Sequence, residues 1–171
     1  MHNPLTVAQA VVTLTEELKS HGLTLDVSSD MVAFNETKKQ VRGFEVAPMH
    51  HHEVGIFTHE RAHWFSIRNA EGQCVGLQAF RCDEIDTNLA DWCVTYMIGA
   101  YMRRHELMVP AYTKPPKGSI SERLSGKLAY HGELWIDKPY RKRDIIEHFV
   151  RAALILTYIK WRPDAIWCLA G

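Results

Sequence analysis

Apolar positions in the first third of the chain follow two different spacings. Residues 6–22 carry apolar side chains three and four positions apart, which predicts an amphipathic helix that ends near Gly22. Residues 23–35 and 40–48 carry short alternating apolar patterns between turn-forming residues, which predict two short strands. A polar, histidine-rich connector follows.

The pattern changes to period two at Trp64. Residues 64–68 and 74–80 are two extended runs, and the intervening NAEGQ is a turn sequence, so we predict an antiparallel hairpin. Residues 86–105 return to helical spacing and predict a buried helix, lined by aromatic side chains such as Trp92. Residues 109–127 are rich in Pro, Gly and Ser and predict a long loop.

The last third has the clearest pattern. Residues 132–139 form an apolar run broken by Pro139, residues 144–162 are apolar around most of a helix, and residues 163–171 contain a second short apolar run. Strand, basic loop, helix and strand make a βαβ unit, which implies a parallel strand pair. We therefore predict an α/β fold with a mixed sheet.

We expect one domain over residues 1–171. Its parts are an amino-terminal helical and strand part, the hairpin, a helix with a long loop, and the βαβ unit, at residues 1–63, 64–81, 83–127 and 131–170.

Composition excludes several classes of function. Hydrophobic residues make up 46% and charged residues 23% of the chain, as in ordinary globular proteins, and 20 Lys and Arg balance 20 Asp and Glu. This neutrality argues against nucleic acid or an anionic membrane as the partner. With neither a signal sequence nor a spanning run in the pattern, we expect a cytoplasmic protein. The cysteines form no C-x-x-C pair and are expected to be buried small side chains.

Five of the ten histidines fall between residues 50 and 63, and His59 to His63 spell H-E-x-x-H. In zinc proteases this pattern lies on a helix, where both imidazoles share one face and reach one metal ion. Here His63 runs directly into the predicted hairpin, so we interpret the segment as a polar connector that borders a substrate cleft. A metalloprotein that uses His59 and His63 stays as the third alternative, and no metal is expected in the leading interpretation.

Residues 132–167, GELWIDKPYRKRDIIEHFVRAALILTYIKWRPDAIW, resemble the GCN5-related N-acetyltransferases. The acyl-CoA-binding motif of that family is a strand, a Pro and an aromatic residue, Arg/Gln-x-x-Gly-x-Gly/Ala, a helix and a further strand. Pro139 and Tyr140 match its approach to the phosphate loop. The resemblance implies the family's mixed-sheet fold. The family's fold continues beyond this last strand, so we expect it to be incomplete at the carboxyl end here.

The phosphate loop departs from the family pattern at two positions. The family's glycines let backbone N–H groups approach the pyrophosphate of coenzyme A, and Asp144 and Ile146 occupy those positions here. Positive charges still surround the loop, which favours a bound phosphate. They belong to Lys138, Arg141, Lys142 and Arg143. The resemblance assigns acyl-CoA binding to Leu134, Trp135, Ile136, Arg141, Lys142, Arg143, Asp144, Ile145 and Ile146.

Glu133, at the start of the motif strand, is the candidate general base, with His131 two residues before it. The leading interpretation is an N-acyltransferase that moves an acyl group, in the first instance acetyl, from acyl-CoA to a small-molecule or peptide amine, and that forms a homodimer. The alternative is a non-catalytic domain of the same fold that binds a ligand or partner, and the loss of both loop glycines favours it.

Overall fold

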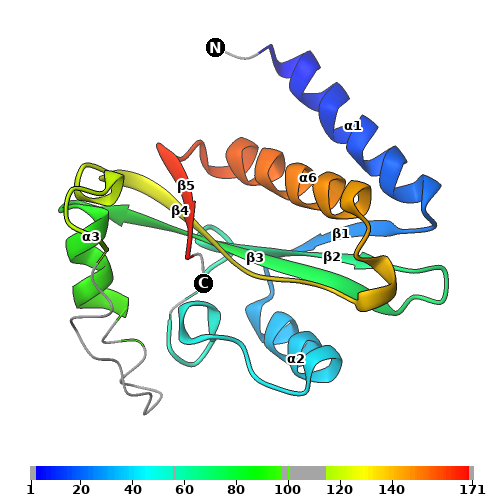
Figure 1. Cartoon of the computed structure of the whole chain (residues 1–171), viewed down its shortest axis with the longest axis horizontal. Helices are drawn as coiled ribbons and strands as arrows, with labels where there is room; N and C mark the ends of the chain where they lie inside the picture. Colours follow the sequence, from blue (N-terminus) through cyan, green and yellow to red (C-terminus); the bar gives the residue numbers. More distant parts are fainter. Residues whose placement is uncertain (1–2, 56, 98–99, 101–114, 170–171) are drawn as a thin grey trace.

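The computed structural model describes residues 3–55, 57–97, 100 and 115–169. A five-stranded mixed sheet, in the order β1-β2-β3-β4-β5, forms its middle layer. Helices α1 (Pro4–Ser20) and α6 (Arg143–Trp161) lie on one face of the sheet, and α2 (Met31–Arg42) lies on the other (Figure 1). The predicted α/β class with a mixed sheet is confirmed.

The predicted hairpin is confirmed and its second arm is longer than expected. Strand β2 (Ala62–Arg68) pairs antiparallel with β3 (Cys74–Ile85), and β1 (Thr24–Ser28) pairs antiparallel with the other edge of β2. The middle strands are buried on both faces, so their side chains form an apolar layer under α6 and another over α2. Phe65 and Phe80 lie in the first layer, and Trp64 and Leu77 lie in the second.

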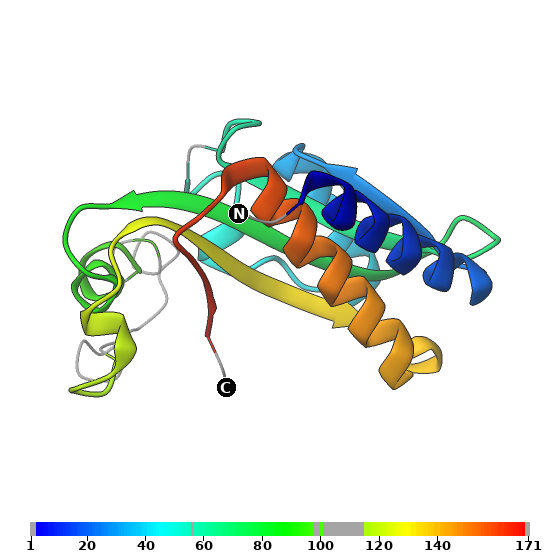
Figure 2. The same ribbon diagram turned by 90° about the horizontal axis from the view of Figure 1, so that it is seen from above.

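The predicted order of strand, helix and parallel strand is confirmed, but the first strand begins at Gly126 rather than at residue 132, and its parallel pairing involves Leu128–His131. Strand β4 (Gly126–Ile136) pairs antiparallel with β3, and β5 (Ala165–Cys168) runs parallel to β4 after the crossover through α6. Figure 2 shows β4 and β5 side by side where they pair and then pointing in different directions.

The strand predicted over residues 40–48 is wrong, and the strand predicted over residues 23–35 is confirmed only for Thr24–Ser28. Residues 40–48 belong to the end of α2 and the loop after it, because a helix begins at Met31. The Asp30 side chain accepts hydrogen bonds from the N–H groups of Val32 and Ala33 and so caps the helix, which ends at Gly43 with φ 74°. The helix packs against the sheet through side chains that include Met31 and Phe34.

The helix predicted over residues 86–105 is described only in part. Helix α3 covers Leu89–Trp92 and continues as a π-helical turn over Cys93–Met97, while most of the predicted second half and Tyr101 lie outside the described residues. The loop predicted over residues 109–127 is described from residue 115, and a short 3-10 turn covers Ile120–Glu122. Of the four cysteines, Cys82 and Cys93 are buried and Cys168 is exposed.

None of the helices in the described part of the chain has the length and apolar content to cross a membrane.

Candidate functional site

A β-bulge interrupts β4 at Glu133. Ala79 of β3 pairs with Gly132, whereas Leu77 pairs with Trp135, so β4 has one more residue than β3 between the two pairs. Glu133 occupies the left-handed region at φ 61°, which is unusual for a residue with a side chain. The bulge turns the Glu133 side chain to the α2 face of the sheet, where strict alternation would have put it on the α6 face.

Beyond the bulge, no strand among the described residues pairs with the outer edge of β4, which we call its open edge. Strand β5 pairs only with Leu128–His131, and β4 continues to Ile136. The Asp137 N–H donates to Val75 O at 2.7 Å, so Asp137 faces β3 and the peptide groups of its neighbour Ile136 face the open edge. Arg141 Nε donates to the Ile136 carbonyl at 2.8 Å from that side, which agrees with this orientation.

A pocket of about 200 Å³ lies along the open edge. Its lining includes five residues assigned to acyl-CoA binding from the sequence, together with Arg42 from the end of α2. The six are Arg42, Leu134, Trp135, Ile136, Arg141 and Ile146. The strand and the phosphate loop therefore meet in one pocket, while Lys142, Arg143, Asp144 and Ile145 do not line it.

The segment after β4 leads into the amino terminus of α6. Lys138–Tyr140 form a 3-10 turn, and the first α6 residue follows Lys142, whose side chain makes no capping hydrogen bond. The Asp144 carboxylate instead accepts from the Ile145 N–H at 2.9 Å and pairs with His21 Nε2 at 2.9 Å. The hydrogen bond from the Ile145 N–H lowers the pKa of Asp144. Slight desolvation opposes this effect, and electrostatic attraction to His21 and Lys142 adds to it. A carboxylate therefore occupies this helix end, where the dipole favours an anion.

The two candidate bases lie on opposite faces of the sheet. Glu133 forms a buried ion pair with Lys38 of α2 and accepts from the Ala47 N–H at 2.6 Å. His131 faces α6, stacks on Phe80 at 4.4 Å between ring centroids, and has its pKa lowered to about 4 by burial. The structure thus brings Glu133 to Lys38 and separates it from His131.

A third titratable group lies beside the bulge. His50 is fully buried and stacks on Tyr130 at 5.1 Å, and a Cβ atom added to Gly132 would come within 2.9 Å of its Cε1. Neither ring nitrogen has a hydrogen-bond partner in the described part of the molecule. Burial lowers the pKa of His50 well below its usual value, and the nearby charge of Arg81 lowers it further, which favours the neutral imidazole.

The HERAH segment is a turn followed by the first residues of β2. Exposed His59 lies in the turn and lines a pocket of about 570 Å³ beside the amino terminus of α2. His63 is buried beneath α6, with Nε2 at 2.8 Å from Thr157 Oγ1. The helical arrangement that a zinc protease needs is absent from residues 59–63, and the described residues contain no group of three metal-binding side chains.

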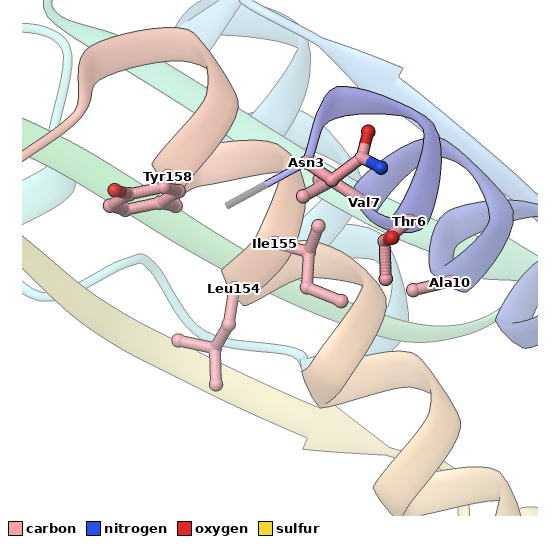
Figure 3. A pocket seen from close by; sticks show the side chains of 7 residues that line it. All are labelled: Asn3, Thr6, Val7, Ala10, Leu154, Ile155 and Tyr158. Carbon is pink, nitrogen blue, oxygen red and sulfur yellow. The ribbon is translucent and has the colours of Figure 1, made fainter. Parts of the chain in front are cut away.

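A larger pocket of about 620 Å³ lies between α1 and α6 (Figure 3). Its lining is mostly apolar and contains no acid, base or cation apart from the Tyr158 hydroxyl. This pocket offers a surface for packing but no group for acid-base chemistry.

Sequence patterns missed two residues of the site, Lys38 and Arg42. Both lie on α2, whose first and last residues fall within the strands predicted over residues 23–35 and 40–48. The overlooked signal was Asp30 before Met31, because an aspartate in that position is a typical helix cap.

No family model and no curated protein matches the chain. Among solved structures it is similar to a GCN5-related N-acetyltransferase from Ralstonia eutropha, at 10% identity over 87% of this chain and 84% of the other, with a TM-score of 0.48. A predicted acetyltransferase from Clostridium acetobutylicum, solved with acetyl-CoA, has 10% identity over 87% and 81%, with a TM-score of 0.48. An aminoglycoside acetyltransferase from an uncultured soil metagenomic sample, solved with sisomicin, has 14% identity over 89% and 80%, also with a TM-score of 0.48. The likeness concerns the fold alone.

Proposed function

We propose that the protein is an N-acyltransferase that moves an acyl group, in the simplest case acetyl, from acyl-coenzyme A to an amine. One observation carries this proposal: β4 continues past its last pair with β5, and the end of this strand lines a pocket together with Arg141 of the basic loop before α6. A ligand that contains amides can pair with such an edge as an added strand does. A ligand that also carries phosphates fits the adjacent cations.

In this proposal the chain binds acyl-CoA in two parts. Outward-facing peptide groups at Leu134 and Ile136 pair with the amides of the pantetheine arm. Arg141, Lys142 and Arg143 hold the pyrophosphate as ion pairs, since the backbone approach that two glycines would permit is restricted here. This arrangement places the thioester towards the bulge at Glu133.

The proposed transfer is a direct attack at the bulge. The amine nitrogen attacks the thioester carbonyl carbon, a C–N bond forms, the C–S bond breaks, and the electron pair leaves on sulfur as the thiolate of coenzyme A. The amine loses one proton, which the Glu133 carboxylate takes up as general base. Lys38 and the Ala47 N–H hold that carboxylate in place on the α2 face. His131 lies on the other face of the sheet, where it stacks on Phe80. We therefore propose that it contributes to core packing and takes no proton from the amine.

Calorimetric titration with acetyl-CoA tests the proposal. We expect saturable binding by the wild type and weaker binding by Arg141→Gln. Arg151→Gln is the matched control, since Arg151 lies farther along α6 and pairs with Glu147 at 2.8 Å. The absence of binding up to millimolar acetyl-CoA would contradict the proposal.

A second measurement separates an enzyme from a binding domain of the same fold. Release of the coenzyme A thiol is followed with a thiol reagent in the presence of a panel of small amines and peptides. Release that depends on one class of amine and is lost in Glu133→Gln supports the transfer. Tight acetyl-CoA binding without release above the solvent background, whatever the amine, would favour the non-catalytic alternative.

A further inference from the structure

Arg42 is a positively charged residue at the open edge of β4, and it lies outside the phosphate-loop motif. It is the last residue of α2, is half-buried, and lines the pocket that contains Ile136 and Arg141. Helix α2 and helix α6 cover opposite faces of the sheet (Figure 1). The two arginines therefore approach the same strand edge from different sides.

Two aromatic rings hold the Arg42 guanidinium. Its Cζ lies 4.8 Å from the ring centroid of Phe44 and 5.8 Å from that of Trp135. Gly43 makes the Phe44 contact possible, because its left-handed backbone at φ 74° turns the chain back beside the helix end. Phe44 remains 50% exposed, so its ring is kept at the surface where it covers Arg42.

Cation–π contacts with Phe44 and Trp135 favour the position of the Arg42 guanidinium at the pocket. Its five N–H donors suit the oxygens of a phosphate. Arg42 has no acidic partner within the described part of the chain. Its charge is therefore held by aromatic rings and not by an ion pair among the described residues.

Two acidic side chains close to Arg141 in the sequence are engaged with other groups. Asp144 pairs with His21 and accepts from the Ile145 N–H, and Asp137 accepts from the Lys138 N–H at 2.8 Å. The pocket itself is lined by two arginines and no acid. An anion with several oxygens fits this charge better than an amine does.

We propose that Arg42 binds a phosphate group of the acyl-CoA and, together with Arg141, grips the ligand from both faces of the β4 edge. This inference rests on the proposed function, since acyl-CoA is the phosphate-bearing ligand that the function supplies. In this proposal an arginine on α2, held by cation–π contacts, replaces part of the phosphate binding that glycines in the loop would have allowed.

The test compares ligands with and without phosphates. Arg42→Met keeps the unbranched stem and removes the charge, and it is expected to weaken acetyl-CoA binding about tenfold to 100-fold, the range for a charge-assisted hydrogen bond. Arg42→Lys should recover part of this loss, because a lysine keeps the charge without the planar fork. Acetyl-pantetheine, which lacks phosphates, should bind wild type and Arg42→Met equally.

Binding of inorganic pyrophosphate tests the anion site of Arg42 separately from the proposed acyltransferase function. If Arg42→Met weakens pyrophosphate binding but the wild type does not bind acetyl-CoA, the anion-binding role of Arg42 is supported and the acyltransferase proposal is contradicted. Equal pyrophosphate and acetyl-CoA affinities in wild type and Arg42→Met would overturn the inference, as would a wild type that binds neither. An arginine that only stabilises the end of α2 would shift the unfolding midpoint in urea and weaken acetyl-CoA and acetyl-pantetheine equally, which would also overturn it.

Discussion

Glu133 of β4 and Lys38 of α2, which are 95 residues apart in the chain, form a buried ion pair beside the β4 bulge. The side chains are 9% and 7% exposed, so both charges have left water. The Ala47 N–H binds the second carboxylate oxygen, and the Phe44 ring lies 5.0 Å from the lysine nitrogen. The pair therefore connects α2 and the loop after it to the strand that carries the proposed chemistry.

Removal of Lys38 should destabilise the fold. Lys38→Met leaves the Glu133 carboxylate buried without its cation, and losing one partner of a buried pair costs about 3–5 kcal/mol. The free energy of unfolding in urea measures this cost. Lys39→Met is the control, because Lys39 is exposed and lies 3.7 Å from Glu45, and it should change the free energy by less than about 1 kcal/mol. A similar small change in both variants would contradict the importance of the pair.

The βαβ unit could be predicted from the sequence because its signals are local and strong. Helix α6 has 19 residues with apolar positions on most sides, and short apolar strands flank it. Helix α2 could not be predicted as easily. Its buried positions Met31, Phe34, Asn35 and Lys38 have helical spacing, but two of the four are polar, so the apolar pattern alone does not reveal the helix.

The site itself depends on contacts that local patterns do not encode. Glu133 was singled out by its position in the motif strand, but the bulge that turns it towards α2 comes from the pairing of β4 with β3. The same bulge separates Glu133 from His131, which the sequence places only two positions away. The partners Lys38 and Arg42 come from a distant segment, so their roles follow from the tertiary structure alone.

The open edge of β4 makes a prediction about the backbone. Proline at position 136 removes an N–H that faces away from β3, so Ile136→Pro should keep the sheet while weakening acetyl-CoA binding by up to about tenfold, the value of one hydrogen bond. Ile136→Val shortens the same buried side chain and keeps the N–H, and is the control. Calorimetry compares the two, and circular dichroism checks the fold. Equal affinities would show that the ligand does not pair with this edge.

Asp144 makes a prediction about charge at the start of α6. Asp144→Asn removes a negative charge beside the basic loop and keeps an oxygen that can accept from the Ile145 N–H. Acetyl-CoA affinity should rise about two- to fivefold, which is the size of a charge effect at a helix end. The control is Glu147→Gln, which makes the same charge change one turn farther along α6, where Glu147 pairs with Arg151. A weaker affinity in Asp144→Asn than in wild type would mean that the carboxylate assists binding.

Buried histidines make a prediction about stability in acid. Burial, with a smaller contribution from Lys160, lowers the pKa of His63 from 6.5 to about 3. The unfolded chain therefore takes up a proton on His63 near pH 6.5, whereas the folded chain does not until about pH 3. The free energy of unfolding should thus be highest above pH 6.5 and fall as the pH decreases from 6.5 towards 3, by at most about 1.4 kcal/mol per pH unit for this group.

His63→Phe tests this assignment, because phenylalanine fills the space between Phe65 and Trp161 without a titratable nitrogen. Urea unfolding between pH 6.5 and 4.5 should give a slope against pH that is smaller by about 1 kcal/mol per unit than in the wild type. His131, whose pKa burial lowers to about 4, keeps part of the slope in this variant. His59→Phe, which makes the same substitution at an exposed position, is the matched control. If His63→Phe leaves the slope unchanged, the folded protein protonates His63 as readily as the unfolded chain does.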